Sequence, residues 1–147
     1  MFASTVGLGI DSFLACLAVA PIVPRRRDRI ALAAILGASD GYATFAASVG
    51  GLTLYLVAAG IVLGALAIAV ASPGLRRVSA LPVLLSIDNL VTPLSPGDAV
   101  AAGVASFALA GLGFVASTMI LRSVPPRLHA RVAIALGIVA LAVIVRG

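Results

Sequence analysis

Clusters of arginine and proline divide this chain into six apolar stretches of about 20 residues each. A helix needs about 20 predominantly apolar residues to cross the hydrocarbon core of a bilayer. The pattern therefore predicts an all-α integral membrane protein with six transmembrane helices. The predicted spans are residues 2–23, 30–50, 52–71, 78–96, 99–121 and 128–145.

The composition excludes several other classes of protein. Hydrophobic residues make up 62% of the 147 residues and charged residues only 10%, which leaves too little polar surface to cover a water-soluble globule. The net charge is +5, but the chain has no lysine and its arginines lie mostly in short connections between spans. We interpret this charge as a signal of membrane topology, and we expect no nucleic-acid partner. The single cysteine, Cys16, excludes an internal disulfide.

The arginines also predict how the helices are oriented. They gather in the first, third and fifth connections, around residues 25–29, 76–77 and 122–131, whereas the second and fourth connections carry no basic residue. Loops rich in arginine stay on the cytoplasmic side of a membrane. We therefore expect these three connections in the cytoplasm and both termini outside. No basic segment follows Met1, so we expect the first span to be retained rather than cleaved as a signal peptide.

The two halves of the chain, residues 1–75 and 76–147, read as repeats of three helices each. Similar motifs occur in the first helix of each half, Gly9-Ile10-Asp11-Ser12 and Ser86-Ile87-Asp88-Asn89. An odd number of spans per repeat reverses the second repeat in the membrane, and inverted repeats of this kind place a substrate site near the midplane. We expect one membrane domain in which the third and sixth spans are peripheral.

Three aspartates lie in the middle of predicted spans. Asp11, Asp40 and Asp88 are each about nine or ten residues from the start of their span, which at about 1.5 Å per residue puts them roughly 15 Å deep. Charged side chains at this depth are costly and usually mark the pathway of an ion or proton. We expect the first, second, fourth and fifth spans to enclose a narrow polar centre, in which Ser106 is the counterpart of Asp40 on the fifth span.

The polar groups of this centre are hard oxygen donors, which suit Mn²⁺, Mg²⁺ or Ca²⁺. Pro93 adds to them, because it cannot donate a hydrogen bond to the carbonyl of Asn89. Two or three carboxylates would balance the charge of a divalent cation. The candidate metal ligands are Asp11, Asp40, Asp88, Asn89, Ser12, Ser86 and Thr92.

Two short motifs resemble a known family. Residues 7–13 are similar to the first-helix motif of the bacterial manganese efflux pumps of the MntP type, and Ser86-Ile87-Asp88 resembles its repeat in the fourth helix. Continued by Asn89-Leu90, the second motif also resembles the TerC membrane proteins of the lysine-exporter superfamily. The resemblance implies export of Mn²⁺ or a similar cation across the bacterial inner membrane in exchange for protons, with Asp11 and Asp88 as paired ligands.

Two other functions remain open at this point. One is export of a small cationic or zwitterionic solute, and the other is a non-transporting membrane subunit whose aspartates form hydrogen bonds between helices. Enzyme signatures are missing from the sequence, so we expect no enzymatic activity and no permanently bound cofactor. The expected partners are the lipid bilayer, the transported metal ion and protons, and the glycine-rich helix faces leave a homodimer open.

Overall fold

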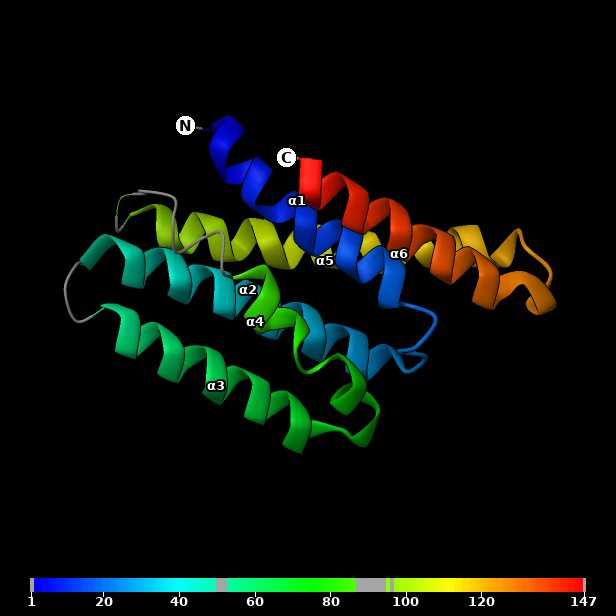
Figure 1. Cartoon of the computed structure of the whole chain (residues 1–147), viewed down its shortest axis with the longest axis horizontal. Coiled ribbons are helices and arrows are strands. Elements are labelled where there is room, and N and C mark those ends of the chain that lie inside the picture. The colour runs from blue at the N-terminus through cyan, green and yellow to red at the C-terminus, as the bar shows by residue number, and fades with distance from the viewer. Residues whose placement is uncertain (1, 50–52, 87–94, 96, 147) are drawn as a thin grey trace.

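The computed structural model of the chain describes residues 2–49, 53–86, 95 and 97–146, and these residues are helical without a strand (Figure 1). Six α-helices and two short 3₁₀ helices account for nearly all of this described part. They are α1 (Phe2–Val19), α2 (Arg26–Val49), α3 (Thr53–Ala71), η1 (Pro73–Val78), α4 (Leu81–Leu85), α5 (Asp98–Arg122), η3 (Pro126–Leu128) and α6 (His129–Arg146).

Five of the six predicted spans correspond to helices whose bounds differ from the prediction by a few residues. The largest differences are at the first connection, where α1 ends at Val19 and α2 begins at Arg26. Pro21 has no N–H to continue the hydrogen bonding of α1, so the helix ends before it. The arginines after Pro24 enter the first turn of α2, where the carboxylate of Asp28 favours a helix N-terminus.

The predicted start of the fourth span at residue 78 is three residues too early. The chain instead forms η1, capped by Ser72, whose side chain accepts a hydrogen bond from the N–H of Gly74. Helix α4 then begins at Leu81, with Pro82 in its first turn, where the missing N–H leaves no hydrogen bond unmade. Its described part ends at Leu85. The rest of the predicted span, including Pro93, lies outside the described residues.

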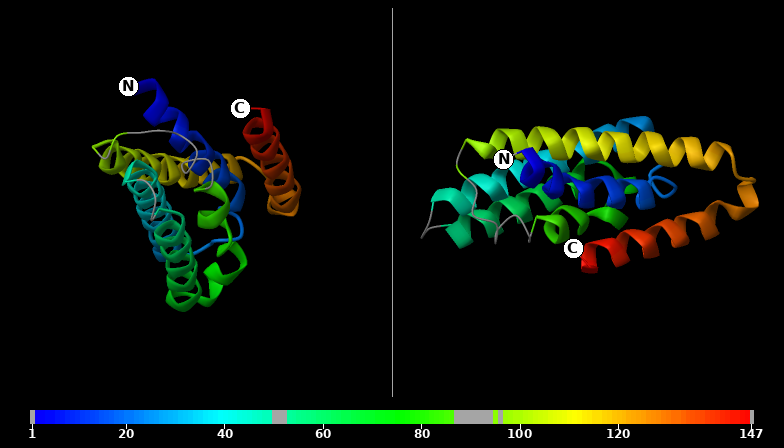
Figure 2. Two further views of the ribbon diagram at one scale, coloured as in Figure 1. Left: turned by 60° about the vertical axis from the view of Figure 1, so that its left-hand side comes forward. Right: turned by 90° about the horizontal axis from the view of Figure 1, so that it is seen from above.

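Helix α5 packs along both α1 and α2 (Figure 1), and in the right-hand view of Figure 2 it runs along one side of the molecule. Helix α3 packs on α2, and α6 packs on α1, so α3 and α6 are peripheral, as the sequence predicts. Glycine lets the helices approach closely. A Cβ on Gly37 of α2 would lie 2.6 Å from the carbonyl oxygen of Gly103 on α5, and a Cβ on Gly113 would overlap the carbonyl oxygen of Phe13 on α1.

The contact between α2 and α3 also depends on a glycine. Gly60 of α3 lies against the ring of Tyr42 on α2, at a distance that a Cβ would not permit. The hydroxyl of Tyr42 donates a hydrogen bond to the carbonyl of Leu56 on α3. Gly64, one turn further along, faces Ser39 of α2. The glycine pair spaced by four residues therefore packs α3 closely onto its neighbour.

The connections that carry arginine lie at one end of the molecule. The α1–α2 connection, η1 and the α5–α6 connection are all at the right-hand end in Figure 1. The basic residues between helices therefore gather at this end, as the sequence predicts. His129 is part of the same end, where its Nε2 lies 3.0 Å and 2.9 Å from the carbonyl oxygens of Leu121 and Val124.

Two helices of the described chain are long and apolar enough to cross a membrane, Arg26–Ser48 and Asp98–Arg122. The most apolar 18-residue window of the α5 segment is only 33% buried, against 50% for α2. Most of the apolar surface of α5 thus faces outward, which favours association with a membrane.

Alanine substitutions at two helical glycines, Gly37 and Gly137, distinguish the effect of close helix packing from the general effect of glycine on helix stability. Gly37→Ala should destabilise the protein by about 1–3 kcal/mol, because the new methyl group must push α2 and α5 apart. Gly137 of α6 is the matched control, because a Cβ there meets no atom within 4 Å. Gly137→Ala should leave stability unchanged or raise it by about 0.5–1 kcal/mol. Thermal unfolding of the purified variants measures both, and equal effects would contradict the observed α2–α5 contact.

Candidate functional site

A buried carboxylate lies in the middle of the helix assembly. Asp40 of α2 is 1% exposed, and three serine hydroxyls from three other segments surround it. Ser12 of α1 is 3.2 Å from its Oδ2, Ser86 at the end of α4 is 3.1 Å from its Oδ1, and Ser106 of α5 also donates to Oδ2. We refer to these four residues as the Asp40 cluster.

Small residues around the cluster explain how the hydroxyls reach the carboxylate. Gly37 and Gly41 flank Asp40 on α2 and face Gly103 of α5, so the two helix backbones come close at this height. Ser106 lies one turn beyond Gly103 on the same helix. Since a serine side chain is short, hydrogen bonding to Asp40 requires this close approach. The stripe of small residues on α5 therefore positions a polar group as well as packing the helix.

The hydrogen bonds of the cluster leave room for one more proton. Ser12 and Ser106 also lie 2.7 Å from each other, so these two hydroxyls and Oδ2 of Asp40 form three contacts. The two serines supply only two protons, because each hydroxyl has one. A proton on the carboxyl group would supply the third. The cluster can therefore satisfy Asp40 both as an ionised carboxylate and as a neutral acid.

The cluster connects the two sequence motifs. Ser12 belongs to the motif of the first half and Ser86 to the motif of the second half, and they bind opposite oxygens of one carboxylate. Asp11 is partly buried, and its Oδ1 accepts a hydrogen bond of 2.9 Å from the N–H of Ser12. Three predicted ligands, Asp88, Asn89 and Thr92, lie outside the described residues.

The described residues bring together Asp40, Ser12 and Ser86 of the predicted ligand set. They do not bring three carboxylates together, since no group of three His, Cys, Asp or Glu side chains that could hold a metal ion occurs among them. The site that this part of the chain shows is one carboxylate with three hydroxyls. All four groups are hard oxygen donors, and any further carboxylate ligand would have to come from Asp11 or Asp88.

Sequence reasoning missed two side chains of this region as candidate ligands. It identified Ser106 as the counterpart of Asp40 without including it in the ligand set. The ligand set also leaves out Thr44, which lies on the same face of α2 as Asp40 and is fully buried; its Oγ1 has no hydrogen-bond partner among the described residues. The available signal was helical spacing, because residues four apart lie on the same face of a helix.

Comparison of the chain with protein-family models, with curated proteins and with solved structures finds no match.

Two serines on α5 test the energetic role of the cluster. Ser106→Ala removes a hydroxyl that binds Asp40 and should destabilise the protein by about 1.5–3 kcal/mol, the usual value for hydrogen bonds to charged groups. Ser117→Ala is the matched control, because Ser117 is equally buried on the same helix and its hydroxyl has no partner. It should be neutral or stabilising. Unfolding of both variants in one solvent system makes the comparison, and the same loss in both would show that Ser106 acts only by packing.

Proposed function

We propose that this chain is a multi-pass protein of the bacterial inner membrane that exports a divalent cation, with Mn²⁺ as the favoured substrate, in exchange for protons. The observation that carries the proposal is the Asp40 cluster, in which a buried carboxylate receives one hydroxyl from each of the two matching motifs. A buried acid with oxygen neighbours is a site at which a cation and a proton can replace each other.

The surface of the helices supports the membrane placement. Large apolar side chains are exposed on the described parts of α3, α5 and α6, where they form apolar surface of a kind that a water-soluble monomer seldom leaves uncovered. A bilayer provides the apolar surroundings that this surface requires. The exposed residues are Leu56, Val62, Leu63, Leu66 and Val70 on α3, Val100, Val104, Phe107, Leu112, Val115 and Met119 on α5, and Ile134, Ile138 and Val139 on α6.

The packing of the helices supports two related halves. If the halves are related, α1 corresponds to α4, α2 to α5 and α3 to α6. The contacts of α1 with α5 and α6 then correspond to contacts of α4 with α2 and α3, and all four contacts occur. The contact between α2 and α5 is its own counterpart. The α2–α3 contact breaks the correspondence, because α5 and α6 diverge from their connection (Figure 2). Inverted repeats are the architecture that opens one central site to the two sides in turn.

The polar groups near Asp40 support a hard cation as substrate. Asp11 directly precedes Ser12, and Asp88 follows Ser86 by two residues, so each serine of the cluster has a second carboxylate close to it in sequence. The unpartnered hydroxyl of Thr44 adds an oxygen donor one turn away. Carboxylate and hydroxyl oxygens are ligands of Mn²⁺, Mg²⁺ and Ca²⁺, and the resemblance of the motifs to manganese pumps selects Mn²⁺.

The spare proton position supports coupling to protons. When a cation leaves a buried site, the carboxylate that held it loses its compensating charge, and protonation removes that cost. The contacts among Ser12, Ser106 and Asp40 accommodate this proton without losing a hydrogen bond. A cycle in which the cation and the proton occupy the Asp40 cluster alternately is therefore proton antiport.

A second candidate function is favoured by the same hydrogen bonds. Polar side chains that bond across helices stabilise membrane bundles with no transported substrate, and Asp40 contacts three segments in this way. The chain would then be a structural membrane subunit. The two candidates differ in whether the charge of Asp40 is needed or only its hydrogen bonding.

Asp40→Asn separates the two candidates. The amide has the shape of the carboxylate and can still bond to the serine hydroxyls, but it carries no charge and takes up no proton. Cells that lack their own manganese exporter should lose protection from Mn²⁺ when the variant replaces the native chain. The expected loss is complete, to the sensitivity of cells with no exporter. Cellular manganese content, measured at matched membrane expression, provides the direct readout.

Asp98→Asn is the matched control for this experiment. Asp98 is at the start of α5, where it accepts hydrogen bonds from Ser95, away from the Asp40 cluster. This variant should export normally. The double variant Asp11→Asn plus Asp88→Asn tests the paired motif carboxylates and should behave like Asp40→Asn. If the native chain protects against neither Mn²⁺ nor any other divalent cation, or if Asp40→Asn is fully active, cation export is the wrong function and a structural role is favoured.

A further inference from the structure

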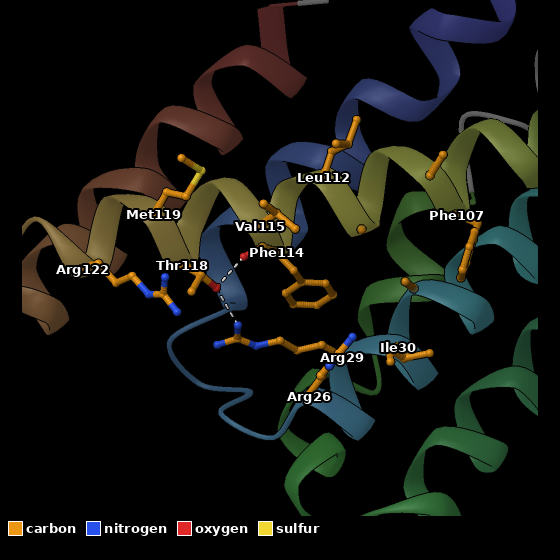
Figure 3. Close-up of a pocket in the computed structure, with 13 residues that line it drawn as sticks. Arg26, Arg29, Ile30, Phe107, Leu112, Phe114, Val115, Thr118, Met119 and Arg122 are labelled. Atoms are coloured by element: carbon orange, nitrogen blue, oxygen red, sulfur yellow. Dashed lines mark hydrogen bonds between the residues drawn. The ribbon is translucent and has the colours of Figure 1, made fainter.

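A pocket of about 660 Å³ lies on the outer surface between α2 and α5, at the arginine-bearing end of the molecule (Figure 3). Arg26, Arg29, Arg122 and Thr118 line one part of it, and the rest is apolar. We propose that this pocket binds one anionic phospholipid, with the phosphate at the arginines and an acyl chain along the apolar part. We call it the arginine pocket.

Arg29 is held rigidly at the base of the pocket. Its guanidinium donates to the hydroxyl of Thr118 at 2.7 Å and to the carbonyl oxygens of Val23 and Ala20 at 2.7 Å and 3.0 Å. It also lies 5.8 Å from the centre of the Phe114 ring. A guanidinium has five N–H donors, so two are left for a ligand. The remaining donors have a fixed direction because the other three contacts orient the group.

The positive charge of the pocket is not compensated by a carboxylate in its lining. Arg26 and Arg122 are exposed, and the described part of the chain provides neither of them with a hydrogen bond or an ion pair. Figure 3 shows the guanidinium groups of Arg29 and Arg122 at the same end of the pocket. Asp28 is buried on the other side of α2, next to Gly74. An anion with several acceptor oxygens, such as a phosphodiester, matches these donors.

The apolar part of the pocket continues along the two helices. Ile30, Leu112, Val115 and Met119 line it with large side chains that are 55–66% exposed. A second groove of about 540 Å³ between the same helices shares Phe107 with it and extends to Gly41. From Arg29 to Gly41 the helix rises roughly 18 Å, close to the ~15 Å thickness of one leaflet. The groove therefore has the length of an acyl chain whose headgroup is at the arginines.

A lipid explains both parts of the pocket together. A free phosphate ion would use the arginines but leave the apolar groove empty, and a zwitterionic lipid would leave the positive charge uncompensated. Basic pockets between helices on the cytoplasmic side are typical sites for anionic headgroups. This inference rests on the membrane placement proposed above but not on cation transport, and the two can fail separately.

Two independent changes in the arginine pocket test the inference. Arg26→Gln plus Arg122→Gln removes two charges, and Gly111→Leu fills the groove without a clash, because a Cβ on Gly111 meets no atom within 4 Å. Matched controls exist for both. Arg77→Gln plus Arg127→Gln removes two exposed arginines outside the pocket, and Gly137→Leu adds the same side chain at an equally open position on α6.

The measurement is native mass spectrometry of the full chain purified in detergent, titrated with phosphatidylglycerol or with phosphatidylcholine of identical acyl chains. The native chain should retain one phosphatidylglycerol in preference to phosphatidylcholine. The double arginine variant should bind it about thirtyfold more weakly, as expected for two basic residues at a headgroup. Gly111→Leu should lose the preference, and both controls should keep it.

Five results would overturn the inference. Equal binding of the two lipids, or retention of phosphatidylglycerol by both pocket variants, would show that the arginine pocket is not a lipid site. An equal loss in the Arg77 and Arg127 control would show general charge attraction, and displacement by inorganic phosphate alone would show an anion site without a lipid. Alkaline carbonate extraction of cell membranes provides a separate check of the placement, because release of the native chain would refute both the placement and the lipid site. Manganese export is measured in a separate experiment, and its outcome bears on neither the lipid titration nor the carbonate extraction.

Discussion

The arrangement of the helices depends on the burial of one carboxylate. Asp40 is 1% exposed, and an ionised group at this depth is tolerated only when hydrogen bonds compensate for the lost water. Its compensation comes from α1, α5 and the end of α4, so these segments must meet at one height on α2. Such a meeting requires closely packed backbones. The glycines at the α2–α5 and α1–α5 contacts provide that approach, and larger residues there would separate the hydroxyls from the acid.

The hydrogen bonds to Asp40 would suit both a structural role and the proposed transport. Transport would also require that they adapt when the carboxylate gains or loses a proton, and hydroxyl groups can do this. A hydroxyl both donates and accepts, so Ser12 and Ser106 can adapt to a carboxylate that gains or loses a proton. Lysine or arginine in these positions would fix Asp40 in its charged state. A cluster of serines holds the acid in place while leaving its charge free to change, which a purely structural contact does not need. Thr44 is buried beside the cluster, and its hydroxyl has no hydrogen-bond partner among the described residues.

Much of the helical layout could be predicted from local sequence, whereas the site could be predicted only in part. The arginine and proline punctuation gave the bounds of α3, α5 and α6 to within one residue, because helix length and helix ends are local properties. The beginning of α4 was missed, since Pro82 fits the first turn of a helix as well as a kink within one. The position of Asp40 in the middle of α2 could be expected from counting residues. Its neighbourhood with Ser12 and Ser86 could be expected from the two matching motifs, which put the three residues in one ligand set. The individual hydrogen bonds could not, because Ser12, Ser86 and Ser106 are 28, 46 and 66 residues away and helical periodicity does not fix the contacts between different helices.

Hydrogen bonds join α2 and α5 at two positions along their length, and this constrains how a cation would reach the proposed site. Arg29 pairs with Thr118 near the arginine-bearing end, and Asp40 pairs with Ser106 in the centre. In two antiparallel helices, facing residues have numbers with a nearly constant sum. The sums for these two pairs are 147 and 146, so both pairs belong to one register. The outer pair is close to the surface, whereas the inner pair is buried. A cation that binds Asp40 must therefore compete with the serine hydroxyls while the outer pair keeps the register. A lipid in the arginine pocket would strengthen that outer pair, because its phosphate would hold together arginines that otherwise repel one another.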